Sequence, residues 1–193
     1  MKVLSFDTSF SFLNLSIIEN GKPTLLFFLD GEKKTLENLP KVFQDMDIYP
    51  QEYDAYAISL GVGYLTPLRI GITFMKTWAY LFKKPIVGYE NLELMLKYAQ
   101  THFPCMACLK VSNKIFARTL DEKGISDIKI VSFQELDLER TISLKGQGIE
   151  SKTVLEFFPF SLYGGLESYK KLSSGYRGDD PFFLEPIYLT PVY

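Results

Sequence analysis

The stretch GVGYLTPLRIG at residues 61–71 lies between an apolar run at residues 54–60 and a long helical pattern. Glycine-rich turns between a strand and a helix often bind phosphate, because a helix N-terminus attracts anions. Here, however, the Gly-Lys-Ser/Thr of a Walker loop, the third glycine of a dinucleotide fingerprint and the serine of a nucleophile elbow are all missing. We interpret Gly61 and Gly63 as parts of a tight turn, after which Thr66 caps the helix and Pro67 occupies its first position.

The helix predicted at about residues 67–83 carries apolar side chains over an arc of roughly 200°, twice what one buried face requires. One edge of the arc comprises Leu68, Ile72, Met75 and Ala79, and the other comprises Ile70, Phe74 and Leu81. The sequence does not say which edge faces the sheet. Gly71 would let a second helix approach closely. We infer that the surplus apolar surface meets a helix of another chain, and the alternative is that the second domain covers it.

Upstream, the pattern predicts strands at residues 2–7, 12–18 and 23–29, whose short turns require antiparallel pairing. A helix is predicted at residues 35–46, where Pro40 should kink it or mark its true first turn. Further elements are expected in the order strand, helix, strand, helix, at residues 54–60, about 67–83, 85–89 and about 90–100. These later strands should join the sheet in parallel through right-handed crossovers.

A second unit is predicted to begin after residue 102. Its strands are expected at about residues 105–111, 114–120, 128–132 and 141–145. The tail at residues 163–186 is rich in Gly, Ser and Pro, so we expect mostly loop with one short helix. The predicted domains are therefore a complete lobe at residues 1–102 and a reduced lobe at residues 103–193.

Composition excludes several classes of function. The chain has 193 residues, of which 47% are hydrophobic, so it can bury a substantial core. Its net charge is −2 and its lysine pairs are scattered, so direct, strong binding of nucleic acid is not expected. The N-terminal segment lacks the pattern of a signal peptide, and no apolar run reaches membrane-spanning length. We expect a cytoplasmic protein that does not contact a membrane.

The two cysteines form a single C-x-x-C motif, Cys105 to Cys108, in a segment that is predicted to be a strand. A zinc site would need two further ligands, and His102 has no second histidine as companion. Thioredoxin-like cysteines open a helix, whereas residues three apart in a strand point to opposite faces. We therefore interpret both cysteines as small core residues and expect no metal.

Five segments resemble the TsaB (YeaZ) family: DTS at 7–9, LPKVF at 39–43, GVGYLTPLRIG at 61–71, KPIVGYENLELM at 84–95 and PIYLTPVY at 186–193. The third typically reads GPGSFTGLRIG in the family, and the resemblance is strong over residues 1–100 and weak over 101–180. It implies an α/β fold of the actin and hexokinase ATPase superfamily, with a mixed sheet of an antiparallel meander plus parallel strands and a truncated second lobe. It also implies a noncatalytic role in the tRNA modification N6-threonylcarbamoyladenosine at position 37.

The same resemblance implies partners. Family members pair with TsaD, the catalytic paralogue, through two helices that correspond to residues 35–46 and 67–83, and TsaE, a small ATPase, joins the pair. Any ATP is then held by the partner subunits, tRNA is contacted only indirectly, and a homodimer forms through the same helices. The expected interface consists of Leu36, Leu39, Phe43, Met46, Leu68, Arg69, Gly71, Ile72, Met75 and Ala79.

The residues themselves argue against catalysis. An ATPase of this superfamily folds its first hairpin around phosphate with a glycine and places an Asp near the metal. The turn at residues 7–11, DTSFS, has no glycine, and CLKVSNKIF at 108–116 offers Lys and Asn where a second Asp is needed. LYGG at 162–165 is similar to the adenosine-binding Gly-Gly of the superfamily, although a turn explains it as well. We expect structural roles for the motif-loop residues Asp7, Thr8, Ser9, Gly61, Gly63, Thr66 and Pro67.

Three functions remain at this stage. The first is a noncatalytic scaffold for TsaD, and the second is a nucleotide-binding or ATPase-like protein that uses a residual interlobe cleft. The third, a protease, lacks a Ser/His/Asp constellation and ranks last.

Overall fold

The computed structural model describes residues 1–30 and 39–188. The chain divides into two compact units, and the first comprises Met1–Tyr89 together with Pro159–Pro186. The second unit comprises Glu90–Phe158 and, of the described C-terminal residues, Ile187 and Tyr188. The predicted boundary after residue 102 is therefore wrong, because the second unit begins at Glu90 and Pro159–Pro186 return to the first unit.

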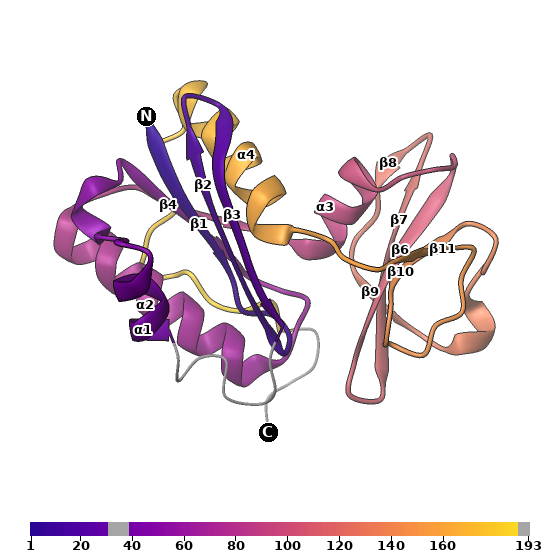
Figure 1. Cartoon of the computed structure of the whole chain (residues 1–193). Coiled ribbons are helices and arrows are strands. Elements are labelled where there is room, and N and C mark those ends of the chain that lie inside the picture. Colours follow the sequence, from indigo (N-terminus) through magenta and orange to yellow (C-terminus); the bar gives the residue numbers. More distant parts are fainter. Residues whose placement is uncertain (31–38, 189–193) are drawn as a thin grey trace. The chain divides into compact units, whose positions relative to one another are not determined.

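The first unit contains a five-stranded mixed sheet in the order β3-β2-β1-β4-β5 (Figure 1). Its strands are β1 (Lys2–Asp7), β2 (Phe12–Glu19), β3 (Lys22–Asp30), β4 (Ala55–Ser59) and β5 (Ile86–Tyr89). The first three pair antiparallel, whereas β4 pairs in parallel with β1 and β5 pairs in parallel with β4. This confirms the predicted meander followed by parallel strands.

Helices cover both faces of this sheet. Figure 1 shows α1 (Leu39–Asp45) and α2 (Leu65–Phe82) on one face and α4 (Phe160–Ser173) on the other. A short 3-10 helix, η1 (Pro50–Glu52), precedes β4. Strands between two layers bury both of their faces, which explains why β1 and β2 are buried along almost their whole length.

The start of α2 differs from the prediction. The helix begins at Leu65, and its N-cap is Tyr64, whose side chain makes no capping hydrogen bond. The backbone amide of Tyr64 donates to the carbonyl oxygen of Ser9 at 2.7 Å, so the first hairpin fixes where the helix starts. Thr66 is therefore not the cap, and Pro67 lies in the first turn, where a missing amide hydrogen costs nothing.

The described part of α1 begins at Leu39. Pro40 is the second residue of this described part. The predicted helical residues 35–38, including Leu36, lie outside the described part of the chain.

The second unit holds a sheet in the order β11-β10-β6-β7-β8, with β9 also paired to β7. Its strands are β6 (Cys105–Val111), β7 (Lys114–Asp121), β8 (Gly124–Ile125), β9 (Lys129–Val131), β10 (Thr141–Leu144) and β11 (Thr153–Leu155). The four predicted strands are confirmed, whereas the short strands β8 and β11 were not predicted. A 3-10 helix, η2 (Phe133–Glu135), connects β9 to β10.

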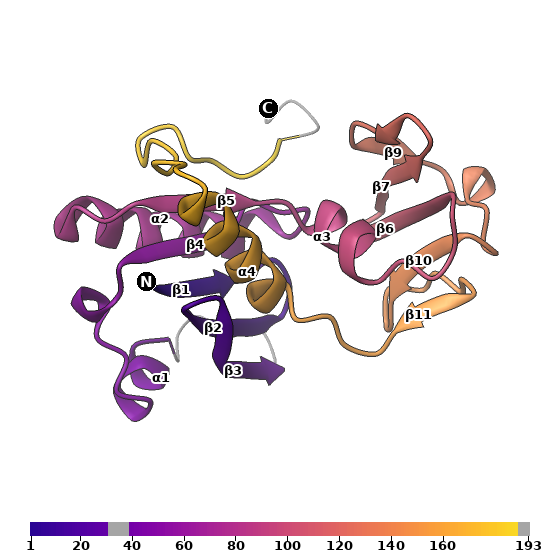
Figure 2. The same ribbon diagram turned by 90° about the horizontal axis from the view of Figure 1, so that it is seen from above.

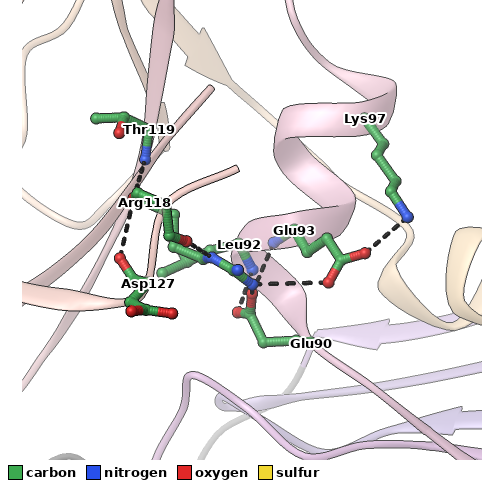
Figure 3. A network of polar contacts seen from close by, with 8 residues as sticks. Glu90, Leu92, Glu93, Lys97, Arg118, Thr119 and Asp127 are labelled. Atoms are coloured by element: carbon green, nitrogen blue, oxygen red, sulfur yellow. Dashed lines mark hydrogen bonds and ion pairs between the residues drawn. The ribbon is translucent and has the colours of Figure 1, made fainter. Parts of the chain in front are cut away.

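Helix α3 (Asn91–Tyr98) packs against β6 and β7 and is fixed by ionic contacts (Figure 3). The carboxylate of Glu90 caps the helix by accepting from the amides of Leu92 at 2.6 Å and Glu93 at 2.8 Å. Arg118 on β7 donates to Glu90 at 2.9 Å and lies 3.6 Å from Glu93, which pairs in turn with Lys97 at 2.6 Å. Burial raises the pKa of Glu90, and the hydrogen bonds from Arg118 and the two amides partly offset this rise.

Removal of Arg118 should therefore make stability more dependent on pH. The folded state raises the pKa of Glu90, so the stability linked to this group is complete below the unfolded pKa and falls as the pH rises through the folded pKa. Arg118→Ala removes an interaction that lowers this pKa, and we expect a loss of about 2 kcal/mol at pH 7.5 and a smaller loss at pH 4.5. Urea unfolding at both pH values measures this difference.

Arg140→Ala is the matched control, because Arg140 forms an exposed pair with Asp137 at 3.8 Å. Such a pair contributes less than about 1 kcal/mol. An Arg118→Ala loss that is equal at both pH values would contradict the assigned role of Glu90.

Candidate partner-binding surface

The glycine loop and the first hairpin bond to each other. Within the β1–β2 turn, both the amide and the hydroxyl of Ser9 donate to the same carboxylate oxygen of Asp7, with the amide at 3.0 Å. The Ser9 hydroxyl also lies 2.9 Å from the hydroxyl of Ser59, to which the amide of Gly61 donates at 3.1 Å. Asp7 is completely buried. These hydrogen bonds hold the turn, the end of β4 and the loop together.

Two glycines make this close approach sterically feasible. A Cβ atom on Gly63 would lie 2.4 Å from the carbonyl oxygen of Ser9, and one on Gly71 would lie 2.3 Å from the hydroxyl of Thr8. That hydroxyl donates to the carbonyl oxygen of Pro67 at 2.8 Å. Gly71 thus packs α2 against the first hairpin of its own chain, which corrects the expectation that it admits a second helix.

Gly63→Ala is expected to destabilise the first unit by about 2 kcal/mol, because its Cβ would collide with backbone rather than with a flexible side chain. Thr66→Ala provides the control, since Thr66 is exposed and does not cap α2. Its cost should stay within about 0.5 kcal/mol. Thermal melts compare the two, and a larger loss for Thr66→Ala would restore the capping role that the sequence predicts.

The two edges of α2 have different surroundings. Leu68, Ile72, Met75 and Ala79 are buried in the core between α2 and the sheet. The other edge is divided: Ile70 is 44% exposed and Leu81 is 63% exposed, whereas Phe74 is partly buried against the core. The interface predicted through Leu68, Ile72, Met75 and Ala79 is therefore wrong, because these side chains already pack within the chain.

The predicted contribution of α1 is corrected in the same way. Leu39 and Phe43 are buried, and the ring of Phe43 lies 5.6 Å from that of Phe74 and 5.1 Å from that of Trp78. Met46 packs against the same core. Of the predicted interface residues, Arg69 is exposed.

One stripe on the exposed surface of α2 carries no charge. We call Ile70, Thr73, Thr77 and Leu81 the outer stripe, since residues spaced by three to four positions share one face of a helix. Thr73 and Thr77 are exposed, and the Thr77 hydroxyl donates to the Thr73 carbonyl oxygen at 2.7 Å, so it needs no partner from outside. Small and aliphatic side chains on a regular helix are suited to packing against another helix.

The Gly-Gly pair is part of α4 and has a packing role. A Cβ atom on Gly164 would lie 2.4 Å from the ring of Tyr89, and one on Gly165 would lie 2.9 Å from both Ile18 and Ser5. Figure 2 shows α4 lying across the sheet, and it contacts β1, β2 and β4. The two glycines therefore let α4 pack close to the sheet. This packing role explains the Gly-Gly pair without an adenosine site.

Polar residues that were not predicted from the sequence complete this contact. The amide of Ser161 donates to the side-chain oxygen of Asn14 at 2.8 Å, and the hydroxyl of Ser161 lies 2.6 Å from that of Ser16. Their signal in the sequence was the pair of polar residues Asn14 and Ser16, two positions apart in β2, which is typical of a face that meets something other than the apolar core.

Cys105 and Cys108 are both free and buried, which confirms them as core residues. Burial raises the pKa of the Cys108 thiol to about 12, so this thiol is protonated at neutral pH. Among residues 1–30 and 39–188, no three side chains of His, Cys, Asp or Glu gather in a way that could hold a metal ion. Helices long and apolar enough to cross a membrane are absent from the same residues.

Comparison with solved structures identifies the fold. YeaZ from Pseudomonas aeruginosa superimposes with a TM-score of 0.71 at 12% identity, covering 97% of this chain and 100% of that one. This chain has the YeaZ fold. A second structure from the same organism, described as similar to peptidase YeaZ, gives a TM-score of 0.70 at 14% identity and covers 98% of this chain and 99% of that one. The YeaZ fold confirms the expected actin-like α/β architecture, and it confirms the resemblance to the TsaB (YeaZ) family at the level of the fold.

Sequence comparison points to a related protein. Residues 32–114 match the family model described as TsaD, tRNA N6-adenosine threonylcarbamoyltransferase. Proteins with that name from Phytoplasma australiense and Onion yellows phytoplasma (strain OY-M) are 27% and 25% identical over 48% and 56% of this chain. The matches span 34% and 57% of those relatives, so this YeaZ-like chain covers only part of their length.

Proposed function

We propose that this chain is a noncatalytic, TsaB-type subunit that binds TsaD for the N6-threonylcarbamoyladenosine modification of tRNA at position 37. The observation that carries the proposal is the junction between the first hairpin and the glycine loop. At this junction, Ser9, Ser59 and the amide of Gly61 form hydrogen bonds with one another. In an ATPase of the superfamily this position would hold phosphate, whereas here its polar groups make internal contacts.

The comparisons support the same general role. The YeaZ-like fold and the match of residues 32–114 to the TsaD model are both in keeping with a tRNA-modification protein. In this proposal the chemistry belongs to TsaD, and TsaE joins the pair. ATP is held by these partners, tRNA is contacted only indirectly, and the complex works in the cytoplasm.

The outer stripe of α2 is the proposed contact with TsaD. It presents Ile70 and Leu81 without any charged side chain between them, and burial of such residues against a second helix would remove apolar surface from water. In the absence of TsaD, the same stripe could pair with that of a second copy, since a twofold contact uses one patch on both subunits.

Ile70→Asp tests this contact. We expect the variant to melt like the parent, because Ile70 is exposed, and to bind TsaD roughly thirtyfold more weakly, the usual effect of losing an interface anchor. The measurement is sedimentation or calorimetry with the TsaD of the same host. Leu26→Asp is the matched control, because Leu26 lies on β3 with the same exposed fraction of 44%.

Two results would contradict the proposal. If Ile70→Asp bound TsaD with parental affinity, the outer stripe would not be part of the interface. Saturable heat on titration of the isolated chain with ATP and magnesium would instead favour a nucleotide-binding protein.

A further inference from the structure

Residues 179–184, here called the strap, follow α4 and are fixed to the first unit at both ends. At one end, the amide of Asp179 donates to the Ile86 carbonyl oxygen at 2.7 Å, and the amide of Gly88 donates to the Asp179 carboxylate at 2.7 Å. At the other end, Leu184 is buried in the core, and its carbonyl oxygen accepts from the ammonium of Lys76 at 3.2 Å. Figure 2 shows this segment, in yellow, running beside α2.

The middle of the strap presents aromatic rings to solvent. Asp180 holds a turn there by accepting from the amides of Phe182 at 2.9 Å and Phe183 at 3.1 Å. Phe182 is 70% exposed, Phe183 is 82% exposed, and the ring of Phe182 meets that of Tyr80 edge-on at 5.5 Å. Isolated exposed apolar residues are common, but a group held on a fixed turn is typical of an interaction site.

The rings of Tyr80 and Phe182 border an open pocket of about 480 Å³, the strap pocket, lined by Ala79, Tyr80, Leu81, Lys83, Lys84, Pro181 and Phe182. Its wall is apolar and aromatic, and its charged groups are two ammoniums at the C-terminal end of α2. Within the described part of the chain, no carboxylate forms an ion pair with Lys83 or Lys84. Both lysines line the pocket beside its apolar wall.

We propose that the strap pocket docks an acidic segment of a partner protein, which inserts one aromatic or large aliphatic side chain and places its carboxylates against Lys83 and Lys84. The apolar wall requires an apolar anchor, and the positive rim requires negative charge. The pocket is open to solvent, which suits one side chain of a longer segment. Nucleic acid fits less well, because two lysines on a chain with a net charge of −2 would neutralise few phosphates.

The proposal does not rest on binding to TsaD. Tyr80 and the strap lie beside the outer stripe, and Leu81 is the one residue that the two surfaces share. Variants at Lys83, Lys84 and Phe182 therefore test the strap pocket separately from the TsaD contact.

The experiment begins with a random dodecapeptide display library selected against the full chain. We expect enriched peptides to carry an aromatic residue or leucine flanked by Asp or Glu. A synthetic copy of one enriched peptide should bind at least tenfold more weakly to the Lys83→Glu/Lys84→Glu double variant and to Phe182→Ala. Lys22→Glu is the control, since Lys22 is exposed on β3, at the edge of the sheet opposite β5. This variant should bind the peptide with parental affinity.

Several outcomes would overturn the proposal. These are enrichment of peptides without acidic residues, or equal binding by the parent and the strap-pocket variants. Binding of a decauridine oligonucleotide that depends on Lys83 and Lys84 would assign the surface to nucleic acid, and self-association lost in Phe182→Ala would assign it to a second copy. Loss of TsaD binding in these variants would place the pocket in the TsaD interface, whereas failure of the parent to bind TsaD would contradict only the proposed function.

Discussion

Met75→Asp is expected to unfold the first unit, because Met75 is completely buried between α2 and the sheet. A carboxylate at this position would lose its hydration among apolar neighbours without gaining a partner. We expect a loss of about 4 kcal/mol or more in the free energy of unfolding, a large share of the stability of a typical domain.

Urea unfolding and thermal melts followed by circular dichroism measure this effect. Met75→Leu serves as the control, since it conserves volume and should cost less than about 1.5 kcal/mol. If Met75→Asp melted like the parent, this edge of α2 would have to face solvent, and the assignment of the outer stripe to Ile70 and Leu81 would be reversed.

Gly164→Leu is expected to separate α4 from the sheet. The Cβ atom alone would lie 2.4 Å from the ring of Tyr89, and the hydroxyl of Tyr89 donates to the Phe6 carbonyl oxygen at 2.7 Å, which holds the ring in place. Because neither the new side chain nor the Tyr89 ring can move aside easily, we expect a loss of about 3 kcal/mol in the free energy of unfolding.

Lys171→Leu introduces the same side chain at an exposed position of α4 and should leave the melting temperature nearly unchanged. Hydrogen exchange adds a local readout, because Gly164→Leu should reduce protection in α4 before it does so in β5. Parental stability of Gly164→Leu would mean that α4 does not pack closely on this sheet.

Much of the fold could be predicted from the sequence because its signals are local. The short turns between the first three apolar runs require antiparallel strands, and the alternation of strands with helices after residue 54 predicts the parallel part of the sheet. The pairing of β1 with β2 and of β4 with β5 follows this expectation. Asp7 was expected to have a structural role in the first turn, and its carboxylate accepts from the amide of Ser9.

Local sequence patterns did not predict the contacts between residues that lie far apart in the sequence. Nothing near Glu90 predicts that Arg118, on β7, will pair with it, and nothing near Gly164 predicts that it will meet Tyr89. The strap was expected to be loop, and its two anchor points, at Ile86 and Lys76, lie about a hundred residues away along the chain. Such contacts depend on how whole elements pack, which local patterns do not encode.

The sequence by itself determined that α2 has more apolar surface than one face can bury, because that property depends only on the helical period and on residue type. It could not determine which edge is buried, because Leu68 and Ile70 are equally apolar and either could meet a sheet. The tertiary structure decided this through the first hairpin: the hydroxyl of Thr8 donates to the Pro67 carbonyl oxygen, and the missing side chain of Gly71 lets the helix approach Thr8. Those contacts fix the rotation of α2 about its axis, and so they bury Leu68 and leave Ile70 exposed.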